Sequence, residues 1–182
     1  MQRIVLTFGL IAGAIFSAMM FTTAALIDEI GFDKGEILGY TTMVLAFLMV
    51  YFGIRSYRET TPEKSISFGR AFKVGILITL VASTLYVASW EIIYCKVWPD
   101  FGDKYASRVL EKEKATGATA AQLEVKAQEM ARFKELYKNP FFNVGMTLLE
   151  PFPVGLIITL VSAALLRRRN SGHRSYKAIP TV

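Results

Sequence analysis

Two glutamates lie inside long apolar stretches of this sequence, and their carboxylates are the groups best placed to do chemistry there. Glu91 lies in the stretch 74–94, and Glu150 lies in the stretch 141–166. An ionised acid at the centre of a membrane helix costs roughly 2.5–3.5 kcal/mol, so such a residue normally faces the interior of a helix bundle and has a partner. Counted from the basic residues that flank the two stretches, both carboxylates fall at a similar depth, in the outer half.

Aromatic residues surround Glu91. Tyr86 and Tyr94 flank it on the same predicted helix, and a tyrosine hydroxyl can donate a hydrogen bond to a carboxylate at that depth. The same segment also fits an ordinary aromatic belt at a membrane interface. In that interpretation Trp90 and Tyr94 lie at the interface, and Glu91 sits among headgroups or pairs with Lys96.

Two prolines follow Glu150 inside its apolar stretch. Pro151 and Pro153 each remove a backbone donor and free a carbonyl, which in lipid has to be met by protein or water. A kinked helix beside a carboxylate is a common way to build an ion or proton site. The structural alternative is that Glu150 caps the freed backbone or pairs with a lysine of the segment that precedes its helix.

Three interpretations of the two glutamates therefore stay open: structural pairing, an ion or proton pathway, and catalysis. No nucleophile–base pair, metal-ligand spacing or phosphate-binding loop accompanies them in the sequence. Cys95 is the only cysteine and His173 the only histidine, so one chain cannot assemble a disulfide or a histidine-based metal site. The sequence predicts no catalytic residue, no metal site and no cofactor, and a protein that is not an enzyme.

The elements that have to position these residues are four long apolar stretches. Each is about long enough to cross a hydrocarbon core at a rise of about 1.5 Å per residue. The 182-residue chain is 53% hydrophobic, and most of its apolar content lies in these stretches, so little is left for a water-soluble core. The sequence predicts an all-α polytopic membrane protein with a single transmembrane domain over residues 1–169. The predicted transmembrane helices are 4–27, 37–54, 74–94 and 141–166.

The positive charge lies beside the predicted spans, which argues against nucleic-acid binding despite a net charge of +6. The positive-inside rule places both termini and the connection 55–73 in the cytoplasm. The acidic connection 28–36 and the long segment 98–139 then face outward. The tail 170–182 is predicted to be cytoplasmic and disordered. The basic residues behind this orientation are Arg55, Arg58, Arg70, Lys73 and Arg167–Arg168–Arg169.

The segment 98–139 is predicted to form an extracytoplasmic helical hairpin between the third and fourth transmembrane helices. Phe101, Tyr105 and neighbouring apolar residues recur at helical spacing in its first half. Thr119 followed by Gln122 has the pattern of a capping box that opens a second helix. The apolar stripe either covers the end of the bundle or forms a docking surface for a partner protein.

Small residues recur every four positions in the first predicted span, at Gly9, Gly13 and Ser17. Such a spacing lets helix backbones approach closely, and packing is the main source of helix association in lipid. The pattern predicts a helix-packing face, either within one chain or between two copies.

Two sequence segments carry a resemblance to a known family. The first is Ser67-Phe68-Gly69-Arg70-Ala71-Phe72-Lys73-Val74-Gly75, which leads to Trp90-Glu91. The second runs from Asn139-Pro140-Phe141 through Leu149-Glu150-Pro151 to Arg167-Arg168-Arg169. Together they resemble a bacterial membrane family catalogued as domain-of-unknown-function family 4199. The resemblance implies a four-helix bacterial inner-membrane protein and supplies no activity; the tail from Asn170 lies outside the shared region.

The leading hypothesis is a non-enzymatic accessory or interaction subunit of the inner membrane, with both termini cytoplasmic. Its partners would be the lipid bilayer and either a protein partner or a second copy of the chain, without nucleic acid. The alternative is a small ion- or proton-coupled transporter or channel that uses Glu91 and Glu150.

Overall fold

The computed structural model describes residues 1–168, and within that range every regular element is a helix. The predicted all-α fold is confirmed for this part of the chain. The predicted disordered tail 170–182 lies outside the described residues, as does Arg169. In chain order the helices are α1 (Gln2–Ile30), α2 (Phe32–Glu59), α3 (Phe68–Lys96), α4 (Phe101–Ala115), α5 (Ala120–Tyr137), α6 (Pro140–Leu148) and α7 (Pro151–Leu166).

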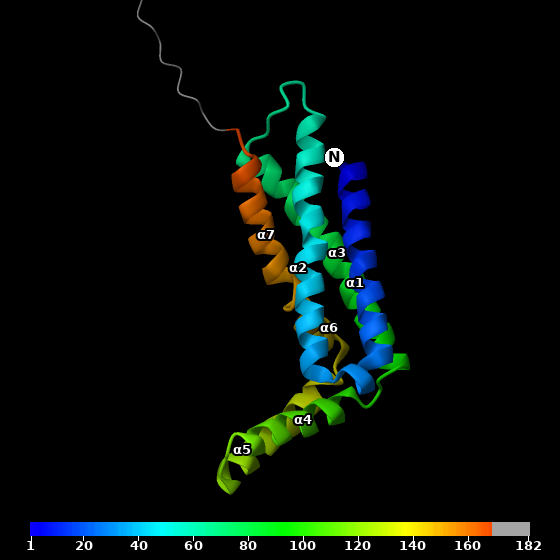
Figure 1. Ribbon diagram of the computed structural model, residues 1–182, viewed down its shortest axis with the longest axis vertical. Coiled ribbons are helices and arrows are strands. Elements are labelled where there is room, and N and C mark those ends of the chain that lie inside the picture. The colour runs from blue at the N-terminus through cyan, green and yellow to red at the C-terminus, as the bar shows by residue number, and fades with distance from the viewer. Residues whose placement is uncertain (169–182) are drawn as a thin grey trace, which may run out of the picture.

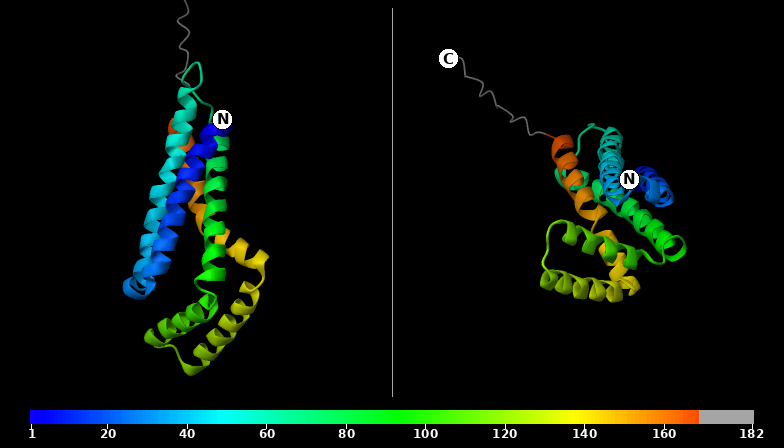
Figure 2. Two further views of the ribbon diagram at one scale, coloured as in Figure 1. Left: turned by 90° about the vertical axis from the view of Figure 1, so that its right-hand side faces the viewer. Right: turned by 60° about the horizontal axis from the view of Figure 1, so that its bottom comes forward.

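The bundle consists of α1, α2, α3 and α7, which run alongside one another (Figure 1). Its central helix is α3, which contacts α1, α2, α7 and the short α6. The N-terminus and the end of α7 lie at one end of the bundle, and α4 and α5 pack side by side at the other end (Figure 2). Which end faces the cytoplasm stays a prediction from the charge pattern.

Four helical segments are long and apolar enough to cross a membrane, as an integral membrane protein requires. Large apolar side chains are exposed along them: Ile37 is 68%, Ile157 61% and Leu165 71% exposed. So much outward-facing apolar surface suits contact with lipid. The four segments are Gln2–Ile27, Phe32–Glu59, Phe68–Lys96 and Pro140–Leu166, the last comprising α6 and α7.

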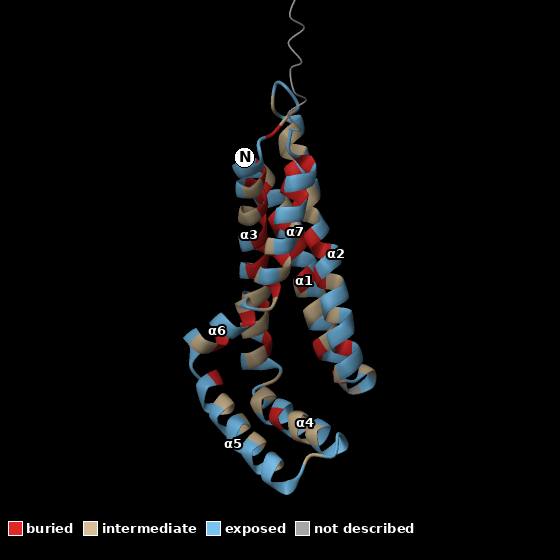
Figure 3. Cartoon of the chain, turned by 90° about the vertical axis from the view of Figure 1, so that its left-hand side faces the viewer, coloured by how far each residue is buried: buried red, intermediate tan, exposed pale blue. Residues whose placement is uncertain are grey.

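Glycines allow α7 to approach both α3 and α2 closely in the middle of the bundle. A Cβ added at Gly75 would lie 2.7 Å from Thr159 Cγ2, and one added at Gly155 would lie 2.7 Å from Phe47 Cζ. The fully buried hydroxyls of Thr79 and Thr159 form a 3.1 Å hydrogen bond across the same contact. Figure 3 shows the buried residues along the inner sides of the bundle helices. The centre of the bundle is therefore tightly packed.

The fourth span is two helices, whereas the sequence predicts one kinked helix. α6 ends at Leu148 and α7 begins at Pro151. Pro151 has no N–H for the carbonyl of residue 147, and its ring crowds that turn; Pro153 repeats both effects two residues later. With two donors lost so close together, the helix breaks and leaves Leu149 and Glu150 at the junction.

The acidic connection predicted at residues 28–36 is almost entirely helical. α1 continues to Ile30 and α2 starts at Phe32, so Gly31 alone joins them. Gly31 has φ 78° and ψ 153°, a conformation that a side chain would strain. Glu36 thereby becomes part of α2, near its start.

A local sequence signal also fixes where α5 begins. The backbone N–H of Gln122 donates to Thr119 Oγ1 at 3.4 Å, and the Thr119 N–H donates to Gln122 Oε1 at 2.8 Å, so the predicted capping box is confirmed. An ion pair between Lys134 and Asp103 links the two helices. The position of this pair outside the cytoplasm stays a prediction.

Candidate functional site

Glu150 lies at the junction between α6 and α7, and its side chain contacts α3. The Tyr86 hydroxyl donates a 2.6 Å hydrogen bond to Glu150 Oε2, and both side chains are half-buried. Because Glu150 lies between the two helices, the helical periodicity of α6 or α7 does not set the direction of its side chain. The structure therefore brings together two of the sequence-predicted site residues from helices far apart in the chain.

The Glu150 carboxylate lies in the wall of a cavity of about 560 Å³. Helices α1 to α6 all contribute to the wall, which is mainly aromatic and aliphatic. Its aromatic members are Phe16, Phe32, Tyr40, Tyr86, Trp90, Trp98, Phe101, Tyr105, Phe133 and Tyr137.

Seven of these aromatic rings form a connected layer at the end of the bundle where α4 and α5 lie: Phe32, Trp90, Trp98, Phe101, Tyr105, Phe133 and Tyr137. Trp90 packs edge-on against Phe101 with ring centroids 4.7 Å apart, and Phe101 lies 5.6 Å from the Tyr137 ring. The Trp90 indole N–H donates a 2.9 Å hydrogen bond to the Tyr137 hydroxyl. Burial raises the pKa of Tyr137, and the Trp90 hydrogen bond opposes that rise only in part. The Tyr137 hydroxyl therefore stays neutral near pH 7.

Three charged side chains reach the cavity: Glu36, Glu150 and Arg108. Arg108 is already matched, because it forms an ion pair with Asp33 and its guanidinium lies 5.0 Å from the centre of the Phe32 ring. Within residues 1–168 neither Glu36 nor Glu150 forms an ion pair. The two carboxyl groups in the cavity wall therefore have no cationic partner among the described residues.

Glu91 lies outside this cavity, although Trp90 and Ile93 beside it line the wall. Five residues separate it from Tyr86, which turns its side chain about 140° round α3. Glu91 Oε1 is buried and has no hydrogen-bond partner among the described residues. Tyr94 packs against Tyr137 with ring centroids 5.5 Å apart and does not line the cavity either. The two glutamates that the transporter alternative uses together thus lie in different surroundings.

The two prolines after Glu150 differ in their surroundings: Pro151 is buried, and Pro153 is exposed. Both act through the backbone, by breaking the helix at the glutamate. Neither side chain lines the cavity.

The small-residue face of α1 is used inside the chain, against α3. A Cβ added at Gly9 would lie 2.7 Å from Val81 Cβ, and one added at Gly13 would lie 2.8 Å from Leu85 Cβ. One turn further on, the Ser89 hydroxyl donates a 2.7 Å hydrogen bond to Ser17 Oγ. This face holds α1 against the helix that carries Tyr86.

Sequence reasoning missed Glu36 and Tyr40, which line the cavity from α2. A signal for them exists: Phe32, Glu36, Tyr40 and Met43 recur at helical spacing and all line the wall. The signal was hidden because the acidic residues around Glu36 suggest a loop. Arg108 and the ring of Trp98 were also missed, since their positions depend on how α4 folds back.

These features define a class of protein: an α-helical protein with four segments able to cross a membrane and a carboxylate-bearing cavity inside one end. The family model described as Protein of unknown function (DUF4199) matches residues 7–168, and the chain belongs to this family. The family resemblance of the two sequence segments is thereby confirmed. No curated protein matches the chain, and no solved structure does.

Proposed function

We propose that this chain is a non-enzymatic protein of the bacterial inner membrane that binds an organic cation in the cavity, with Glu150 as the counter-ion. The ion- or proton-coupled alternative used both Glu91 and Glu150, whereas this cation site uses Glu150 alone. The observation that carries it is the Glu150 carboxylate, held by Tyr86 in an aromatic wall at a helix break.

Charge favours a cation as the ligand. The Tyr86 hydroxyl donates to Glu150 at 2.6 Å, and a hydrogen-bond donor stabilises the ionised form of a carboxylate. Arg108 is occupied by Asp33, so its charge does not neutralise Glu150 or Glu36. In an apolar cavity an unmatched carboxylate attracts an opposite charge more strongly than it does in water.

The aromatic wall favours an organic cation over a small hydrated metal ion. Aromatic faces attract cations, and cages of such rings recognise quaternary ammonium groups. One such contact exists within the wall itself, since the Arg108 guanidinium lies over the Phe32 ring. A cavity of about 560 Å³ is within the usual range for small-molecule sites, about 300–1,000 Å³.

The cavity is closed toward the middle of the bundle, which favours a binding site over an open channel. Five residues beyond Glu150, Gly155 packs against Thr79 and Phe47. Transport of the cation would therefore require α3 and α7 to separate at this contact.

The test is binding of tetraphenylphosphonium to the purified protein in detergent, measured by equilibrium dialysis. We expect saturable binding by the wild type and at least a tenfold loss in Glu150→Gln, which removes the charge and keeps the shape. The matched control is Glu91→Gln, the same substitution on α3 outside the cavity, which is expected to change the affinity less than twofold.

Tetraphenylborate has nearly the same shape as tetraphenylphosphonium and the opposite charge, so it separates charge from burial of apolar surface. Equal binding of the two ions would show that the cavity takes any apolar molecule and would overturn the proposal. So would unchanged tetraphenylphosphonium binding by Glu150→Gln.

An exposed apolar face on α5 supports the second candidate function, that of an interaction subunit. Val125 and Leu136 on α5 are 58% and 43% exposed, and eleven residues of helix place them within about 20° of each other. This face suits contact with a second copy of the chain. The test is molar mass in detergent by light scattering: the double variant Val125→Glu/Leu136→Glu should be monomeric where the wild type is a dimer, and a monomeric wild type would exclude this candidate.

A further inference from the structure

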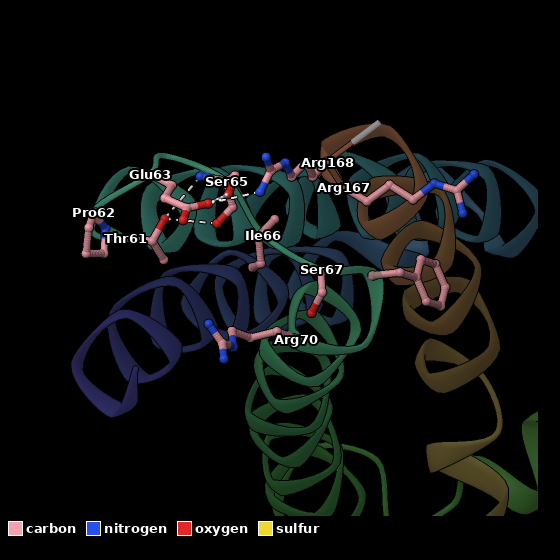
Figure 4. Close-up of a pocket in the computed structure, with 10 residues that line it drawn as sticks. Thr61, Pro62, Glu63, Ser65, Ile66, Ser67, Arg70, Arg167 and Arg168 are labelled. Carbon is pink, nitrogen blue, oxygen red and sulfur yellow. Dashed lines mark hydrogen bonds and ion pairs between the residues drawn. The ribbon is translucent and has the colours of Figure 1, made fainter. Parts of the chain in front are cut away.

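A second pocket lies at the opposite end of the bundle from α4 and α5, around the start of α3 (Figure 4). Its volume is about 920 Å³, and it is enclosed by the connection between α2 and α3, the first turn of α3 and the residues that follow α7. Among residues 1–168, the wall contains Arg70, Arg167 and Arg168 but a single acidic residue, Glu63. Two positive charges are therefore in excess.

Hydrogen bonds hold the connection between α2 and α3 in place. The Ser65 N–H donates to Thr61 Oγ1 at 3.2 Å, and the Arg168 N–H donates to the Ile66 carbonyl at 2.9 Å. Ile66 is only 2% exposed and belongs to the hydrophobic core, which anchors the connection from below. The pocket is thus built on a fixed backbone.

Arg168 and Glu63 form an ion pair with each other. The Arg168 guanidinium donates a 3.0 Å hydrogen bond to Glu63 Oε2, and the Ser65 hydroxyl donates to the same oxygen at 3.3 Å. This pair joins the connection to the end of α7 and leaves the other two arginines as the source of the excess charge.

Arg70 and Arg167 are both exposed and form no ion pair within the part of the chain that the structure describes. Figure 4 shows them on either side of Ser67, with their side chains extending away from each other. Ser67 is the residue before α3, and its hydroxyl makes no capping hydrogen bond to the helix. All three residues line the pocket, and binding one ligand through both guanidinium groups requires these exposed side chains to turn inward.

The pocket adjoins the outward apolar surface of the bundle. Phe68, in its wall, is 38% exposed and stacks on Phe72 with ring centroids 6.3 Å apart. Leu165, two residues before Arg167, is 71% exposed. A ligand that carries an anion at one end and apolar chains at the other meets both surfaces at once.

We infer that this pocket binds the phosphate headgroup of an anionic phospholipid, with Arg70 and Arg167 as its phosphate contacts. The planar guanidinium group is suited to paired hydrogen bonds with phosphate oxygens. Basic pockets between membrane helices bind anionic headgroups in this manner. The apolar border selects a lipid over a free phosphate. The inference is independent of the organic-cation site, which lies at the other end of the bundle.

The test is lipid retention, measured by native mass spectrometry after incubation with equimolar phosphatidylglycerol and phosphatidylcholine. The wild type should retain phosphatidylglycerol in preference. The double variant Arg70→Gln/Arg167→Gln should bind it on the order of 30-fold more weakly, because each basic residue near a membrane surface contributes about fivefold.

The matched control is the double variant Arg3→Gln/Arg55→Gln. It removes the same charge from exposed arginines near the same end of the bundle, outside the pocket. Its affinity for phosphatidylglycerol should stay within about twofold of the wild type. An equal loss in both double variants would show diffuse attraction to the whole basic end and would overturn the inference.

Glycerol 1-phosphate separates a lipid site from a phosphate site. Competition by this soluble headgroup at the lipid's own concentration would show that phosphate alone is recognised and would overturn the lipid assignment. Circular dichroism and size-exclusion profiles establish folding. If the double variant does not fold, the single variants Arg70→Gln and Arg167→Gln replace it, each with an expected loss of about fivefold.

Discussion

The cavity beside Glu150 and the pocket beside Arg70 lie toward opposite ends of the same helix, α3, and their walls are built differently. The cavity wall is made of side chains from six helices, and the carboxyl group of Glu150 is half-buried against Tyr86. The pocket wall is made of a connection and two helix ends, and its arginines are exposed. One end of α3 thus contacts a carboxyl group in apolar surroundings, and the other end lies beside exposed arginines.

This difference predicts how strongly each end responds to substitution. A charge or hydrogen bond inside a low-dielectric cavity is worth more than the same interaction at an exposed surface, where water and salt screen it. Substitutions around Glu150 and the packed contact beside it should therefore affect stability, and substitutions around Arg70 should mainly affect binding.

The largest effect is expected from Gly155→Ala, at the packed contact that separates the two ends. The new Cβ would lie 2.7 Å from Phe47 Cζ, so side chains or backbone have to shift, at a cost of about 2–3 kcal/mol. Thermal unfolding in detergent measures the change. The control is Gly145→Ala on α6, where a Cβ meets nothing within 4 Å and Ala stabilises a helix by about 1 kcal/mol. A neutral Gly155→Ala would show that the cavity is not closed at this contact.

The next effect is expected from Tyr86→Phe, which removes the donor to Glu150. A hydrogen bond to a charged group contributes about 1.5–3 kcal/mol, and the carboxylate would lose its only donor within residues 1–168, so a loss of about 2 kcal/mol is expected. Tyr94→Phe is the control, because the Tyr94 hydroxyl makes no hydrogen bond in the described structure and its loss should stay within about 0.5 kcal/mol. Equal losses in the two variants would contradict the special role of Glu150.

Much of the cavity end could be predicted from the sequence, because local patterns decide it. Four apolar stretches predict the helices, and Pro151 and Pro153 predict a distortion at Glu150. A tyrosine on the third span was an expected partner for a glutamate, and Tyr86 is a partner, although of Glu150 and not of its neighbour Glu91. Which glutamate a tyrosine meets depends on the rotation of α3 against α7, and spacing along one helix does not contain that information.

The enclosure of the cavity could not be predicted, for a similar physical reason. Arg108, Tyr105 and Phe133 reach the wall only because α4 and α5 pack across the end of the bundle. The helical periodicity of α4 and α5 predicts an apolar stripe, but it does not predict which surface that stripe packs against. At the other end, the basic residues beside the spans were visible in the sequence, but the pocket was not, since it depends on a hydrogen bond from the Arg168 N–H to the Ile66 carbonyl, more than a hundred residues apart.

The smallest effect on stability is expected from Glu63→Gln, at the exposed end. The Glu63 and Arg168 side chains are 72% and 66% exposed, and an ion pair of this kind contributes at most about 1 kcal/mol, so a loss below about 0.5 kcal/mol is expected. The substitution also removes the only negative charge that the described residues contribute to the pocket wall, and it releases Arg168, so the affinity for phosphatidylglycerol should rise about fivefold.

The control for this last change is Glu59→Gln, which breaks the neighbouring surface pair with Arg58 outside the pocket. It should match the small stability effect of Glu63→Gln and leave lipid affinity within about twofold. A stability loss above about 1.5 kcal/mol in Glu63→Gln alone would mean that the connection between α2 and α3 depends on its ion pair as the cavity depends on Tyr86. The two ends of α3 would then be held in the same way, and exposure would not explain their difference.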